Sequence, residues 1–158
     1  MAWIELARKT VFGKTLACSA SDALRLTGHT VVHDKGLTTV FNHGVPVITT
    51  DGLACLTIDG LRFEAERKWL QLRGLRANGC VLGFDWSPKG EGGYRRVRVR
   101  DSSDAGTSFI VKHDERLGFN LKTRVRIETA QTRVDTALML GCLVFFWTLF
   151  ENDRVSYA

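Results

Sequence analysis

The first part of the chain alternates short β-branched runs with clusters of turn residues. This pattern predicts strands that are joined by tight hairpins. The predicted strands are Val31–Val32, Thr38–Phe41, Val45–Thr50 and Leu53–Ile58. The turn clusters that separate or close them are His33–Gly36, Asn42–Gly44, Asp51–Gly52 and Asp59–Gly60. Because Pro46 has no N–H for a sheet ladder, we expect its strand to lie at a sheet edge.

The segment Leu61–Leu75 fits two hydrophobic periods, and the sequence leaves both open. A helix would gather four apolar residues on one face, namely Leu61, Ala65, Trp69 and Leu72. A strand would instead place three of them on one face, namely Leu61, Phe63 and Ala65. In either case the turn residues Ala77–Gly79 end the element.

Three clearer strands follow a glycine-rich loop at Ser87–Gly93. We expect them at Tyr94–Arg100, Thr107–His113 and Leu121–Glu128. Side chains alternate between the two faces of a strand, so the pattern predicts an antiparallel meander with one basic side. Its basic residues form two rows, Arg96, Arg98, Arg100 and Lys122, Arg124, Arg126, with Lys112 between them. The opposite face carries Val97, Val99, Val125 and Ile127.

The end of the chain predicts one apolar helix at about residues 136–150. Asp135 or Thr136 can cap its start, and Ala137–Phe150 is apolar apart from Thr148. No polar stripe divides this run, so a helix lying on the protein surface is excluded. Fifteen helical residues span roughly 22 Å, whereas a bilayer core is about 30 Å thick and needs about 20 apolar residues. We therefore expect the helix to be buried inside the fold.

The stretch Asp135–Glu151 resembles the terminal helix of the phospholipid-scramblase-like, LURP-one and tubby C-terminal group. It has an acidic start, an apolar body with the small residue Gly141, and aromatic residues before Glu151. The resemblance implies a closed antiparallel barrel around one central helix, and phosphoinositide or membrane-surface binding as in tubby-like members. The sequence departs from the group in having no cysteine cluster suited to acylation and no acidic calcium loop near the helix, which counts against lipid scrambling.

Pattern and resemblance together predict a mainly β fold. We expect residues 1–158 to form one domain, an antiparallel closed barrel or strongly curved sheet around a single C-terminal hydrophobic helix. The net charge of +5 is concentrated in the middle of the chain. Residues 61–134 carry sixteen Lys and Arg against nine Asp and Glu. This excess indicates an acidic partner or a solvated basic face, and the sequence leaves both open.

Nothing in the sequence indicates catalysis, so we expect a protein without enzymatic activity, cofactor or metal. Three histidines, His29, His33 and His43, lie among turns without a complementary ligand set. The four cysteines, Cys18, Cys55, Cys80 and Cys142, form no C-x-x-C pair. This usage favours a reducing intracellular compartment. Membrane association and the organelle, a mitochondrial one included, stay open.

Three functions are consistent with these features. The first is an accessory domain that docks through its basic rows onto anionic lipid headgroups or an acidic protein surface in a larger complex. The second is a small tail-anchored membrane protein that uses Ala137–Phe150 as a short transmembrane segment. The third is a nucleic-acid-binding module, which is disfavoured because only Tyr94 supplies an aromatic ring beside the basic rows.

Overall fold

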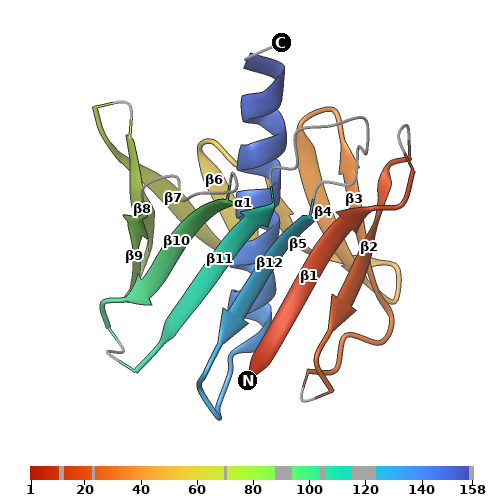
Figure 1. Cartoon of the computed structure of the whole chain (residues 1–158), viewed down its shortest axis with the longest axis horizontal. Helices are drawn as coiled ribbons and strands as arrows, with labels where there is room; N and C mark the ends of the chain where they lie inside the picture. The colour runs from red at the N-terminus through yellow and green to blue at the C-terminus, as the bar shows by residue number, and fades with distance from the viewer. Residues whose placement is uncertain are drawn as a thin grey trace.

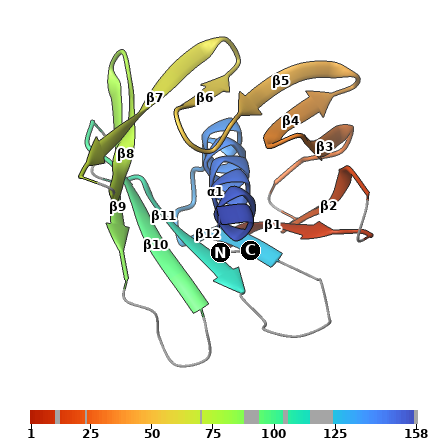
Figure 2. The same ribbon diagram turned by 90° about the horizontal axis from the view of Figure 1, so that it is seen from above.

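The computed structural model describes residues 1–10, 13–22, 24–69, 71–87, 94–103, 106–114 and 124–156. These residues form one closed antiparallel barrel of twelve strands and one C-terminal helix, α1. The helix runs through the middle of the barrel (Figures 1 and 2). The predicted mainly β fold, its closure and its single C-terminal helix are confirmed.

The strands follow one another around the barrel in chain order. They are β1 (Ala2–Arg8), β2 (Thr15–Ala20), β3 (His29–Asp34), β4 (Leu37–Asn42), β5 (Val45–Thr50), β6 (Cys55–Ile58), β7 (Leu61–Lys68), β8 (Gln71–Ala77), β9 (Cys80–Trp86), β10 (Tyr94–Asp101), β11 (Ser108–Asp114) and β12 (Arg124–Thr129). Pairing of β1 with β12 closes the barrel and sets Ile4 opposite Ile127. Both of these side chains are fully buried, which follows from the alternation of inward and outward positions along each strand.

α1 (Thr136–Ser156) begins at an aspartate cap. The Leu138 N–H donates to Asp135 Oδ1 at 3.1 Å, and the Met139 N–H donates to the Asp135 carbonyl at 3.0 Å. The predicted cap at Asp135 is confirmed, and the helix continues six residues beyond the predicted end at residue 150. Among the described residues, we find no helix with the length and apolar character that crossing a membrane requires.

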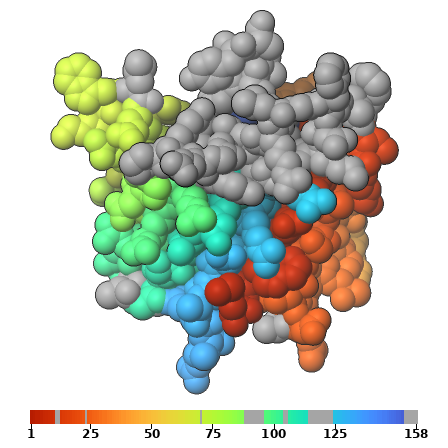
Figure 3. Space-filling view, viewed as in Figure 1, coloured from red at the N-terminus to blue at the C-terminus, as the bar shows by residue number. Residues whose placement is uncertain are grey.

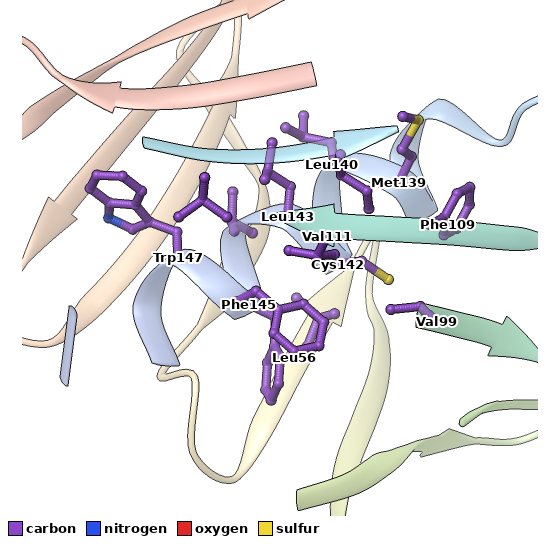
Figure 4. Packing of buried hydrophobic residues seen from close by; sticks show 14 of the residues in the cluster. Leu56, Val99, Phe109, Val111, Met139, Leu140, Cys142, Leu143, Phe145 and Trp147 are labelled. Carbon is purple, nitrogen blue, oxygen red and sulfur yellow. The ribbon is translucent and has the colours of Figure 1, made fainter. Parts of the chain in front are cut away.

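The interior of the barrel is filled by the apolar side chains of α1 (Figure 4). Phe146 is fully buried, with its ring centroid 4.9 Å from that of Phe84 and 5.7 Å from that of Trp86. At Gly141 the helix approaches the wall closely, because a Cβ atom there would lie 2.4 Å from Ile58 Cδ1. The expectation that the helix is buried does not hold in its first turn, where Leu138 is only half-buried.

The strand pairing settles the alternative left open for Leu61–Leu75 and corrects the expectation for Pro46. The ambiguous segment Leu61–Leu75 forms the hairpin of β7 and β8, with Trp69 in its turn at a φ of 61°. Pro46 does not mark a sheet edge, since β5 pairs with β4 on one side and β6 on the other. The register between β4 and β5 shifts after Val40, and this irregularity accommodates a residue without an N–H.

The barrel has two ends that differ in which turns they carry. Because every pairing is antiparallel, the turns after β1, β3, β5 and β7 lie at the end where α1 finishes. We call this the exit end. The turns after β2, β4, β6 and β8 lie at the opposite end, where α1 begins, which we call the entry end.

Candidate binding surface

Strands β10, β11 and β12 lie side by side and form the wall that carries the basic rows (Figure 3). We call it the basic wall. The register sets Arg96 opposite Lys112, and Lys112 opposite Arg126. These three cations therefore lie abreast on strands that are about 4.8 Å apart. Lys112 lies between the two rows, as predicted.

Basic and apolar residues of this wall separate by the predicted alternation. The inward side chains are buried, namely Val97, Val99, Val125 and Ile127. Most of the outward cations are exposed, namely Arg96, Arg98, Arg100 and Arg124. Lys112 and Arg126 are half-buried by their neighbours. Lys122 lies outside the described residues.

Acidic side chains that the sequence reasoning left out neutralise part of the basic wall. Arg100 Nη2 lies 2.6 Å from Asp85 Oδ2. Glu128 forms ion pairs with Lys112 and with Arg126, the latter at 3.5 Å from Nε to Oε2. Glu128 follows Arg126 by two positions, so strand alternation already placed it on the basic side. The contact of Asp85 with Arg100 could be predicted only by knowing that β9 lies beside β10.

Arg126 is also held by β1, which borders the wall where the barrel closes. Its guanidinium carbon lies 4.3 Å from the centroid of the Trp3 ring, and Nη1 lies 3.9 Å from Glu5 Oε2. A cation over an aromatic face is attracted by the ring quadrupole. Arg126 is therefore engaged by three side chains of the protein itself.

Three arginines of the basic wall are exposed and remain available to bind an anionic partner. Within the described part of the chain, Arg96, Arg98 and Arg124 have no carboxylate partner. Arg98 borders a hollow of about 330 Å³ that Glu128, Thr129 and Ile110 also line. An anion in that hollow would meet the negative charge of Glu128 as well, so Arg96 and Arg124 are the better placed pair for an extended anionic surface.

A buried polar cluster lies inside the barrel near the exit end. Glu151 of α1 is buried and pairs with Arg8 of β1. One turn earlier, Thr148 bonds to Thr38 of β4 and donates to the Val144 carbonyl at 2.7 Å. Thr38 in turn bonds to His33 Nδ1 at 2.8 Å.

Burial lowers the pKa of His33, and the nearby Glu151 carboxylate opposes this shift. Most polar atoms of the cluster find partners inside the apolar barrel, as buried polar groups require, but Glu151 Oε1 has no hydrogen-bond partner among the described residues. It also fixes the rotation of α1 relative to β1, β3 and β4.

The thiols that show a shifted pKa are weakly nucleophilic. Burial raises the pKa of Cys18 to about 11. Burial together with the Asp101 carboxylate raises the pKa of Cys80 to about 11 as well. Cys142 is fully enclosed, and burial raises its pKa further. Because the thiolate is the nucleophile, these environments leave little of the reactive form at neutral pH. The described residues contain no group of three His, Cys, Asp or Glu side chains arranged to hold a metal ion.

Comparison of the chain with protein-family models, curated proteins and solved structures finds no match.

Proposed function

We propose that this chain is a non-catalytic binding domain that docks onto an anionic membrane surface through its basic wall. The observation that carries the proposal is the exposure of Arg96 and Arg124 without a carboxylate partner among the described residues. A guanidinium in this state is suited to bidentate hydrogen bonds with phosphate oxygens. Each basic residue near an anionic bilayer contributes about 1 kcal/mol to binding.

Lipid headgroups fit the basic wall better than nucleic acid does. Proteins that bind single strands stack bases on exposed aromatic rings. The Trp3 ring, on β1 beside this wall, is covered by the Arg126 guanidinium. A headgroup surface needs charge and no stacking platform, and charge is what the wall offers.

The fold supports a distant relationship to the scramblase-like, LURP-one and tubby C-terminal group. A closed antiparallel barrel around a C-terminal helix is the arrangement that the resemblance of Asp135–Glu151 implies. Membrane-surface binding in tubby-like members is consistent with the proposal. The relationship itself is part of the proposal.

The test is the double charge reversal Arg96→Glu/Arg124→Glu in the full chain. Its affinity for vesicles that contain phosphatidylserine should fall at least about tenfold, because two attractive charges become repulsive. Both side chains are exposed, so the free energy of unfolding should change by no more than about 0.5 kcal/mol. Co-sedimentation with vesicles measures the first quantity and chemical denaturation the second.

The matched control is Arg25→Glu/Arg133→Glu, which changes the net charge equally. Both residues are exposed, and Arg25 lies in the turn between β2 and β3 while Arg133 lies between β12 and α1. Both residues lie outside the strands of the basic wall, so vesicle binding should be close to that of the parent. Equal binding by the parent and both double variants would contradict the proposal. Tighter binding to an oligonucleotide than to vesicles would favour the nucleic-acid alternative.

A further inference from the structure

Three exposed apolar side chains lie in or beside neighbouring turns of the exit end. Leu37 starts β4 and is 54% exposed, Leu53 lies between β5 and β6 and is 45% exposed, and Trp69 lies between β7 and β8 and is 91% exposed. We call these three residues the tip row. Strands β3 to β8 are consecutive around the barrel, so the three hairpins stand side by side (Figure 2).

Trp69 has no packing role that explains its presence in the turn. Its side chain is almost completely exposed, and its backbone φ is 61°. Left-handed backbone is unfavourable for bulky side chains and is usually taken by Gly or Asn. The turn therefore carries a residue that strains it and contributes nothing to the core. Such a residue suits contact with something outside the molecule.

Hydrogen bonds hold the tip row in a fixed arrangement. Asn152 Nδ2 of α1 donates to the Gly36 carbonyl at 3.3 Å and to the Asp51 carbonyl at 3.0 Å. The helix thus ties the turn beside Leu37 to the turn that contains Leu53. Arg67 Nη2 of β7 donates to the Leu53 carbonyl at 3.1 Å, which links the hairpin of Trp69 to the same turn.

Charge distinguishes the exit end from the entry end, which also exposes apolar side chains. Lys9, Lys14 and Lys35 lie in the described exit-end turns, with Asp51 as the acidic residue there, and Lys14 forms an ion pair with Asp34 at the end of β3. Arg67 and Lys68 directly precede Trp69 and are exposed. In the described entry-end connections, including the segment before α1, the charged residues are Asp22, Arg25, Asp59, Arg133 and Asp135. Among the described residues, exposed apolar tips and an excess of positive charge therefore occur together at the exit end and not at the entry end.

We propose that the tip row inserts into the headgroup region of an anionic bilayer, so that the barrel stands on its exit end. Tryptophan is enriched at membrane–water interfaces, and Lys and Arg beside it meet anionic headgroups. This inference rests on the proposed function and defines its orientation. Arg124 starts β12 at the exit end and Arg96 lies near it, whereas Arg98 is farther down the wall. End-on docking engages Arg96 and Arg124 and leaves Arg98 away from the membrane.

The experiment compares Trp69→Ser with Trp69→Phe and with Leu61→Ser in co-sedimentation with phosphatidylserine-containing vesicles. Leu61 is an exposed apolar residue at the other end of the same strand, β7, so it is the matched control. Trp69→Ser should weaken binding at least about tenfold, because a tryptophan side chain removes about 150–250 Å² from water when it is buried. Trp69→Phe should retain most of the binding, and Leu61→Ser should match the parent.

A second measurement reports insertion without depending on a loss of binding. Lipids brominated on the acyl chain should quench part of the tryptophan emission of the parent, and this quenching should be lost in Trp69→Phe. Arg124→Glu alone should also weaken binding more than Arg98→Glu alone. If the parent binds vesicles while Trp69→Ser binds equally and bromolipid quenching is the same in Trp69→Phe, the tip-row proposal is overturned and the proposed function stands. If the parent does not bind vesicles, both fail.

Discussion

Glu128 decides how much of the basic wall can act on a partner. It forms ion pairs with Lys112 and Arg126, so the charges of two predicted site residues are neutralised within the protein. A surface ion pair contributes little to stability, but it removes net charge from the face that carries it. The prediction of two uniformly basic rows was therefore incomplete, and the charge that remains lies on Arg96, Arg98 and Arg124.

At the residue scale, His33 should make stability depend on pH. Its pKa is below the ordinary value of 6.5 because burial disfavours the imidazolium. The unfolded state then binds the proton more readily, so stability is full above about pH 6.5 and falls as the pH drops toward the folded pKa. Arg8, Glu151 and Asp34 are the charged groups that act on the ring. His33→Asn should make the melting temperature less dependent on pH between pH 7 and 5. An unchanged slope in thermal melts would show that the ring is not perturbed by burial.

At the scale of elements, the turn between β5 and β6 is shaped by its contact with α1. Gly52 has a φ of 70°, and a Cβ atom there would lie 2.5 Å from the Leu149 backbone nitrogen. The Thr50 hydroxyl accepts a hydrogen bond from the Gly52 N–H at 2.9 Å, which holds the turn against the helix. The same turn presents Leu53 at the exit end, so helix packing and the position of the tip row are coupled.

Replacing Gly52 with Ala should therefore destabilise the fold through two effects. The left-handed conformation costs roughly 1–2 kcal/mol for a residue with a Cβ, and overpacking against the helix costs about 1–3 kcal/mol more. Gly60→Ala is the control, since Gly60 has a φ of 83° and no atom within 4 Å of the added Cβ. Chemical denaturation should show a clearly larger loss for Gly52→Ala. Equal losses for the two variants would mean that α1 does not press on this turn.

Elements with a local sequence pattern were predicted, whereas pairings and contacts that depend on closure of the barrel were missed. The alternation of Arg96 to Arg100 and the apolar run of α1 without a polar stripe are local patterns, and both are confirmed. The pairing of β1 with β12 joins residues at opposite ends of the chain, so no short window reveals it. For the same reason the contacts of Glu5 with Arg126 and of Glu151 with Arg8 were not predicted. The exposed Trp69 was assigned to the apolar face of the helical alternative, because hydrophobic spacing alone does not distinguish a turn residue from a residue of the helix that the spacing predicts.

At the scale of the whole molecule, the side chains that stabilise the fold lie inside the barrel, and the side chains that we propose for binding lie on its surface. Apolar side chains of α1 fill the interior, and the polar cluster of Arg8, Glu151, Thr148 and His33 orients the helix. The cations of the basic wall lie on the outside of the barrel, and the tip row lies at its exit end. This division leaves the surface able to bind a partner without changing the core.

The measurement that tests this account most directly is binding of the full chain to vesicles of defined charge. Vesicles of phosphatidylcholine alone should leave the protein in the supernatant, and vesicles with added phosphatidylserine should sediment it. Raising the salt from 0.1 M to 1 M should release it, because the screening length falls from about 10 Å to about 3 Å. Failure to sediment with phosphatidylserine at low salt, or equal sedimentation with both kinds of vesicle, would contradict docking onto an anionic membrane.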